Sequence, residues 1–131
     1  MDVRRPAVMG QFYPDSTADL RSNIEECFLH SLGPGQFPPT PEKEEIFGAI
    51  VPHAGYTYSG PVAANAYYAL SSSGIPETAI ILGPNHWGIG SSVAVAYKSL
   101  WETPLGKLEV DNDAAKELVK FSMIIDQDNS A

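Results

Sequence analysis

The sequence IFGAIVPHAGYTYSGPVAANAYYALSSSGIPETAIIL, which occupies residues 46–82, decides the fold that we expect. Its two ends, 46–51 and 78–82, are short apolar runs of the kind that form buried strands. Between them we expect a helix to about Ser71 that begins at Pro61, which suits a first helical position. Its predicted buried face consists of apolar residues that recur with helical spacing, namely Val62, Ala63, Ala66, Tyr67 and Leu70. Strand, helix and strand in this order predict a βαβ unit with two parallel strands and a right-handed connection. The segment therefore predicts an α/β fold.

Charge is distributed unevenly around this segment. The chain has 8 Lys and Arg and 16 Asp and Glu residues, but of these only Glu77 and Lys98 fall in residues 46–100. A long, nearly uncharged stretch is typical of core strands, the helix packed on them and the loops of a buried site. Two of the 3 histidines lie in this stretch. We therefore expect the functional residues there.

Length and composition exclude several classes of protein. A chain of 131 residues with 44% hydrophobic residues fits one globular domain and is too apolar for a disordered tail. A net charge of −8 without a basic patch argues against nucleic-acid binding. No apolar run is long enough to cross a membrane, and no secretion signal follows Met1. Because Cys27 is the single cysteine, we expect no internal disulfide and a cytoplasmic location.

Further elements are expected on both sides of the βαβ unit. An apolar stripe formed by Leu20, Ile24, Cys27 and Phe28 predicts a helix over 16–32, with Asp15 or Ser16 as its cap. Asp111 can cap a second helix over 111–121. The remaining elements that we expect are a surface loop at 33–41, a strand at 93–97 and the start of another strand at 123–125.

Two histidines follow the two predicted strands of residues 46–82. His53 comes two residues after Val51, and His86 comes four residues after Leu82. Neighbouring parallel strands end about 5 Å apart, or about 10 Å with one strand between them, so both imidazoles can converge on one point. Imidazole is a common ligand of Fe, Zn, Cu and Ni. A single loop histidine is more often a hydrogen-bonding or surface residue, whereas two at equivalent strand ends make a shared metal site a comparable alternative.

Three separated motifs then carry a resemblance to a known family. They are PAVMGQFYP at 6–14, VPHAGYTYSGP at 51–61 and LGPNH at 82–86. Together they resemble the Memo family, whose bacterial and archaeal members are called AmmeMemoRadiSam system protein B. The resemblance implies a fold like that of the class III extradiol dioxygenases, with a central, mostly parallel sheet, helices on both faces and a non-haem metal site.

The resemblance also implies roles for individual residues. It maps His53 and His86 onto two metal ligands, with Fe(II) or Cu as the metal, and leaves the catalytic residues unassigned. Aromatic side chains are typical of a concave apolar pocket beside such a site. Trp87, a bulky residue directly after the expected ligand, departs from the family's pattern and could change access. The pocket-lining residues that we expect are Phe12, Tyr58, Asn85 and Trp87.

Memo chains are longer than this one. In the family a Glu-His-Ser segment, whose histidine corresponds to the acid–base histidine of the dioxygenases, and one further metal ligand follow at about this point. We therefore expect residues 1–131 to form the N-terminal portion of a single Memo-like domain, completed by a missing half or by a second chain. We expect no turnover from this portion alone, because two neutral imidazoles lack a charge-balancing carboxylate or thiolate.

Other candidate residues have simpler explanations. His30 lies near the end of the first helix, where it meets solvent or the last carbonyls, and Cys27 belongs to that helix's apolar stripe as a core thiol. Asp111 begins a sequence similar to a calcium loop, but Lys116 stands where that loop needs glycine, so we expect capping instead.

Two functional hypotheses remain open. The first is a non-haem metal oxidoreductase with dioxygenase-like chemistry, in which an organic substrate enters the aromatic pocket. The second is a non-catalytic module that uses the same pocket to bind a peptide or a small aromatic ligand.

Overall fold

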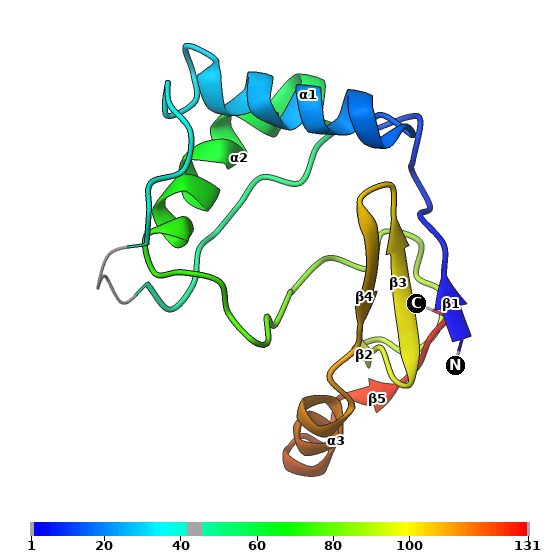
Figure 1. Ribbon diagram of the computed structural model, residues 1–131. Coiled ribbons are helices and arrows are strands. Elements are labelled where there is room, and N and C mark those ends of the chain that lie inside the picture. Colours follow the sequence, from blue (N-terminus) through cyan, green and yellow to red (C-terminus); the bar gives the residue numbers. More distant parts are fainter. Residues whose placement is uncertain (1, 42–45, 131) are drawn as a thin grey trace. The chain divides into compact units, whose positions relative to one another are not determined.

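A computed structural model describes residues 2–41 and 46–130, and the chain divides into two compact units. We call Ala7–Glu77 the helical unit, and Met1–Pro6 together with Thr78–Ala131 the mixed unit. Figure 1 labels the helices and strands of both. The structure is of the α/β type, with helices and with parallel as well as antiparallel strand pairs. Within the described residues no helix is long and apolar enough to cross a lipid bilayer.

The first helix of the helical unit, α1 (Thr17–Leu29), confirms the helix predicted at 16–32 and ends three residues earlier. Ser16 caps it, because its hydroxyl oxygen accepts a hydrogen bond of 3.0 Å from the Asp19 backbone N–H. Leu20 and Cys27 are buried, as the apolar stripe predicted. The cap and the stripe together specify this helix from local sequence alone.

The second helix, α2 (Tyr56–Ser71), begins five residues before Pro61, where we expected it to start. The backbone N–H groups of Tyr58 and Ser59 both donate to the Gly55 carbonyl, so the first turn forms ahead of the proline. Pro61 is then an internal position that offers no N–H to the carbonyl four residues before it. The proline therefore interrupts the hydrogen bonding of α2 and does not begin the helix.

The buried face of α2 also differs from the prediction. We expected Val62 and Tyr67 to be buried, but their side chains are 51% and 55% exposed. Ser59 and Ala64 are buried instead. A Cβ atom on Gly60 would lie 2.5 Å from the Cys27 sulfur, so α1 and α2 approach each other closely at this glycine (Figure 1).

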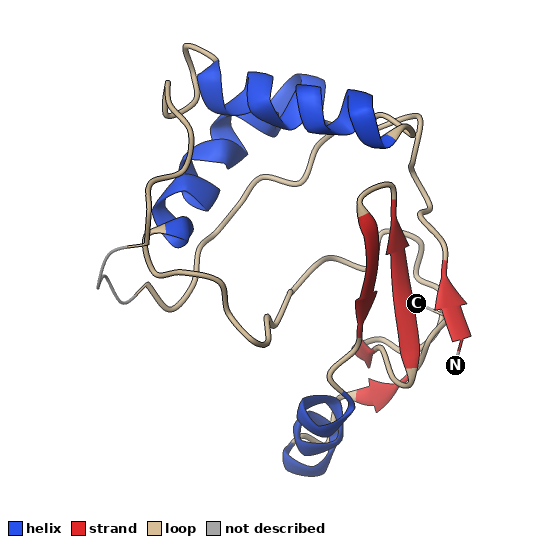
Figure 2. Cartoon of the chain, viewed as in Figure 1, coloured by secondary structure: helices blue, strands red, loops and turns tan. Residues whose placement is uncertain are grey.

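The mixed unit contains a three-stranded sheet in the order β1-β3-β4 (Figure 2). Its strands are β1 (Asp2–Arg4), β3 (Ser99–Thr103) and β4 (Gly106–Glu109). β1 runs parallel to β3, whereas β3 and β4 form an antiparallel hairpin. None of these three strands was expected from the sequence.

The remaining elements of the mixed unit agree better with the sequence. β2 (Ala94–Val95) lies within the strand predicted at 93–97, and it pairs in parallel with β5 (Asp126–Gln127). β5 follows the predicted start at 123–125. α3 (Asn112–Phe121) confirms the predicted helix, and Asp111 caps it by accepting from two backbone N–H groups.

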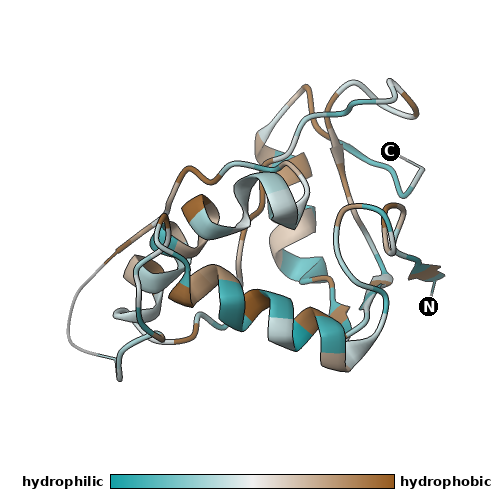
Figure 3. Cartoon of the chain, turned by 90° about the horizontal axis from the view of Figure 1, so that it is seen from above, coloured by the Kyte–Doolittle hydropathy of each residue, from teal (hydrophilic) through white to brown (hydrophobic). Residues whose placement is uncertain are grey.

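The strands predicted at 46–51 and 78–82 are absent from the structure. Among the described residues, no segment forms a ladder with either run, and Ile50 and Leu82 are 101% and 93% exposed. A strand needs a partner for its backbone groups, and an apolar run alone does not supply one. Figure 3 accordingly shows hydrophobic stretches in loops as well as in helices. The βαβ unit predicted from residues 46–82 is therefore wrong for this structure.

A side-chain carboxylate reinforces the β2–β5 ladder. Asp128 follows β5 and accepts hydrogen bonds from the Ser130 hydroxyl, from the Ser130 N–H at 2.8 Å and from the Ser91 N–H at 2.7 Å. These bonds, led by the one from the Ser130 hydroxyl, lower the pKa of Asp128 from 3.8 to about 2. They stabilise the charged carboxylate and join the end of the described chain to the segment before β2.

We expect Gly60→Ala to lower the free energy of unfolding by about 1–3 kcal/mol, because its methyl group overlaps the Cys27 sulfur. Chemical denaturation followed by circular dichroism measures the change. Gly48→Ala is the control, since a Cβ there meets nothing within 4 Å. The double variant Gly60→Ala with Cys27→Ala should recover part of the lost stability, because the sulfur is then absent. If Gly60→Ala costs the same stability with and without Cys27, the contact is contradicted.

We expect the bond between Ser91 and Asp128 to be intact above pH 4 and to be lost as the pH falls towards 2. A carboxyl group whose pKa is lowered by folding stabilises the native state when charged, and that contribution disappears on protonation. The chemical shift of the Ser91 amide proton should report this transition. Asp128→Asn should remove it, and a midpoint near pH 4 in the unmodified chain would contradict the hydrogen-bond assignment.

Candidate functional site

The segment 8–13 forms a tight turn in the helical unit. The Phe12 N–H donates to the Val8 carbonyl at 3.0 Å, and the Gly10 N–H donates to the Tyr13 carbonyl at 2.8 Å. Gly10 has a φ of 77°, a left-handed conformation that glycine adopts without strain. The turn fixes the backbone on either side of Phe12.

The loop that carries His53 docks on this turn. The Tyr56 N–H donates to the Phe12 carbonyl at 2.8 Å, and a Cβ on Gly55 would lie 3.2 Å from the same oxygen. Behind the loop, the Ser59 hydroxyl donates to the Ala54 carbonyl at 3.1 Å. The motifs at 6–14 and 51–61, separated by 36 residues of sequence, therefore meet through backbone contacts.

A hollow of about 320 Å³ lies beside the turn. The rings of Tyr13 and Tyr56 meet there with their centroids 5.8 Å apart and their planes inclined by 44°. Burial, and then the neighbouring Tyr67 and Tyr13, raise the pKa of Tyr56, so this phenol stays neutral at physiological pH. The lining residues are Gly10, Gln11, Phe12, Tyr13, Pro14, Asn23, Tyr56 and Thr57.

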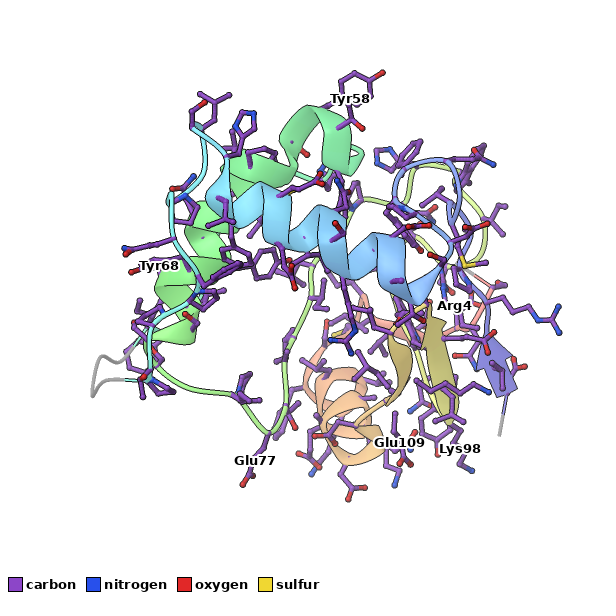
Figure 4. The ribbon with its side chains drawn as sticks, turned by 45° about the horizontal axis from the view of Figure 1, so that its top comes forward. Arg4, Tyr58, Tyr68, Glu77, Lys98 and Glu109 are labelled. Atoms are coloured by element: carbon purple, nitrogen blue, oxygen red, sulfur yellow. The ribbon has the colours of Figure 1, made fainter. Side chains whose placement is uncertain are left out.

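Two predicted pocket residues of the helical unit lie in different surroundings. Phe12 lines this hollow and is half exposed. Tyr58 does not line it, since its side chain is 85% exposed and points away from the first turn of α2 (Figure 4). The aromatic lining of the hollow comes from Phe12, Tyr13 and Tyr56.

The loop that carries His86 is shaped by the residue before the histidine. The Asn85 side-chain oxygen accepts from the Gly88 N–H, and its amide nitrogen donates to the Ile89 carbonyl, both at 2.9 Å. Gly88 has a φ of 61°, which suits glycine at this turn. Trp87, at the tip, is 80% exposed. Asn85 thus holds the loop through both ends of its amide.

His53 belongs to the helical unit and His86 to the mixed unit. Their convergence on one metal ion stays a prediction. Within residues 2–41 and 46–130, no three His, Cys, Asp or Glu side chains form a group that could hold an ion.

Residues 4–131 match the family model described as Memo-like protein. The chain belongs to the Memo family. A MEMO1 family protein of Methanothermobacter thermautotrophicus is 53% identical over 129 residues, which are 98% of this chain and 47% of that protein. Similar proteins from Sulfurisphaera tokodaii and Nitrosopumilus maritimus are 54% and 48% identical over 98% and 96% of this chain. The chain spans less than half the length of these MEMO1 family relatives, at 45–47%.

Three other candidates in this Memo chain have structural roles. Cys27 is a buried thiol whose pKa is raised by burial and then by Glu26, which confirms the prediction of a core thiol. The His30 ring nitrogen Nδ1 accepts from the Leu32 N–H at 3.0 Å and shapes the turn after α1. Asp111 accepts from the Ala114 N–H at 2.9 Å as a helix cap, which confirms the capping prediction.

Several residues in and beside the hollow were not predicted from the sequence. Gln11, Tyr13 and Asn23 line it, and Gly55 and Ser59 anchor the loop beside it. Tyr13 lies within the Memo motif at 6–14, so the resemblance contained a signal for it. Ser59 lies within the motif at 51–61, but the motif does not reveal its role, which depends on a hydrogen bond to a backbone carbonyl five residues earlier.

We expect Asn85→Ala to loosen the His86 loop, because the Gly88 N–H and the Ile89 carbonyl then lose their partner. Amide hydrogen exchange at Gly88 should accelerate about fivefold or more. Asn85→Asp keeps the accepting oxygen and should preserve most of the protection at Gly88. Equal exchange in the unmodified chain and in Asn85→Ala would show that the loop is held by other contacts.

Proposed function

We propose that this chain contributes His53 and His86 as ligands of a non-haem metal site, with Fe(II) or Cu as the metal, in a Memo protein. The proposed complete fold is that of the class III extradiol dioxygenases, with a central, mostly parallel sheet and helices on both faces. One observation carries the proposal: the loop of His53 is docked on the Phe12 turn by the Tyr56–Phe12 backbone bond. This docking joins two of the three Memo motifs in one place.

The donor chemistry of the two loops fits such a metal. Imidazole nitrogen is a suitable ligand for iron and for copper. Hydrogen bonds anchor both loops, at the Phe12 carbonyl for His53 and at the Asn85 amide for His86. An anchored loop loses little conformational entropy when its histidine binds, and this favours metal affinity.

The metal would supply open coordination positions for dioxygen and an organic substrate. The protein's own contribution is the hollow beside the His53 loop, where the neutral Tyr56 phenol can donate a hydrogen bond and Phe12 offers an apolar face. Two imidazoles supply no negative charge. We therefore expect weak metal affinity and no ring cleavage from this chain alone, with a further ligand and an acid–base group coming from another polypeptide segment.

A second candidate function is a binding module without chemistry. It is favoured by the composition of the hollow, because none of the residues that line it is a histidine, a cysteine or a carboxylate. Its aromatic rings and the amides of Gln11 and Asn23 could bind a small aromatic ligand or a peptide side chain without a metal. The two functions differ in whether ligand binding depends on the metal.

We expect His53→Ala and His86→Ala each to lower the content of bound Fe or Cu by about tenfold, while His30→Ala leaves it unchanged. Elemental analysis after equilibrium dialysis against a fixed concentration of the metal measures the content. Binding should weaken in acid, because a ligating imidazole must be neutral. The same metal content in all three variants would contradict the assignment of the ligands.

Catechol binding to the chain with and without Cu(II) separates the two candidate functions. A metal site beside the hollow should strengthen binding at least several-fold, and His53→Ala should abolish that gain. Isothermal titration calorimetry measures the affinity, and an oxygen electrode records any turnover. If metal leaves the affinity unchanged while Tyr13→Ala reduces it, the binding module is the correct function.

A further inference from the structure

The peptide that follows His53 is held from two sides. On one side the Ser59 hydroxyl donates to the Ala54 carbonyl at 3.1 Å. On the other side the Tyr56 N–H donates to the Phe12 carbonyl at 2.8 Å. The backbone between these two bonds consists of Ala54 and Gly55. Its orientation determines where the backbone of His53 lies.

Ser59 is well placed to hold the peptide that follows His53. It is one of the buried residues of α2, with 9% of its surface exposed. Its backbone N–H donates to the Gly55 carbonyl at 3.1 Å, while its hydroxyl reaches the Ala54 carbonyl. One residue therefore binds two consecutive carbonyls of the loop and links the rigid first turn of α2 to the segment after His53.

We propose that Ser59 is a positioning residue for His53, because its hydroxyl fixes the peptide between Ala54 and Gly55 against the Phe12 turn. The proposal deepens the proposed function and rests on it where metal affinity is concerned. The ordering of the His53 loop in the metal-free chain does not depend on that function.

Loss of the hydroxyl has a definite consequence. Ser59→Ala removes the donor to the Ala54 carbonyl without adding bulk, so the loop adopts additional conformations. Metal binding must then restrict the loop to one of them, and this lowers the affinity. A hydrogen bond of ordinary strength corresponds to a change of about three- to tenfold in an equilibrium constant. The Kd of Cu(II), expressed per folded molecule, should rise by this factor.

The control is a serine with the same chemistry at the other end of α2. The Ser71 hydroxyl donates to the Tyr68 carbonyl at 2.6 Å. Ser71→Ala therefore removes an equivalent bond without affecting the His53 loop. We would titrate Cu(II) into the full chain carrying Ser59→Ala or Ser71→Ala, each with and without His53→Ala, by isothermal titration calorimetry.

The expected result is a weaker Cu(II) affinity for Ser59→Ala only when His53 is present, and no change for Ser71→Ala. If Ser59 had a purely structural role, its substitution would lower the folded fraction. The effect on the Cu(II) affinity per folded molecule would then be the same with and without His53, so the coupling energy between the two substitutions would be zero. Ser59→Gly also removes the hydroxyl and adds no group that binds copper, so it provides the same comparison if Ser59→Ala does not fold. An equal effect of the Ser59 variant in both backgrounds would overturn the proposal.

A second measurement uses the metal-free chain. Amide exchange at Tyr56 and ¹³C relaxation of the His53 ring should both increase in the Ser59 variant and stay constant in Ser71→Ala. Unchanged values in both variants would overturn the proposal even if copper binds. If the unmodified chain binds no Cu(II), the proposed function fails, and the metal-free measurement alone decides the role of Ser59.

Discussion

The hydrogen bond from the Tyr56 N–H to the Phe12 carbonyl is the interaction on which the helical unit's site depends. It joins the turn of residues 8–13 to the segment that begins α2. The Tyr13–Tyr56 ring contact and the hollow both lie beside this bond. Donor and acceptor are both backbone groups, so this hydrogen bond does not depend on the chemical type of the neighbouring side chains. It does require those side chains to be small enough for the two backbone segments to approach.

Glycines allow the tight turn and the close approaches of the helical unit at three positions. Gly10 allows the left-handed turn ahead of Phe12, and Gly55 leaves room for the Phe12 carbonyl to approach. Gly60 does the same for the Cys27 sulfur where α1 passes α2. The glycines of the two Memo motifs thus have identifiable packing reasons, and their polar neighbour Ser59 adds a bond to the loop. A small set of close approaches therefore places the His53 loop within its unit.

Local signals in the sequence were sufficient for α1, for α3 and for the position of β2, but not for β1, β3 and β4. Ser16 and Asp111 cap their helices as predicted, because capping needs only neighbouring residues. The runs at 46–51 and 78–82 failed as strands, since pairing depends on a partner that local sequence does not identify. The hairpin of β3 and β4 was missed although Gly106, with a φ of 138°, marks its turn. For the site, the resemblance supplied Phe12, which lines the hollow, while the metal site of His53 and His86 stays a prediction. The backbone bonds that anchor the two loops had no sequence signature.

The proposed function requires His53 and His86 to bind the same metal ion. Pulsed electron paramagnetic resonance of the Cu(II)-loaded chain, with ¹⁵N-labelled histidine, tests it directly by counting the imidazole nitrogens coupled to one copper. We expect two coupled imidazoles, with one lost in His53→Ala and the other in His86→Ala. Coupling to a single imidazole that survives both substitutions, or to none, would contradict it.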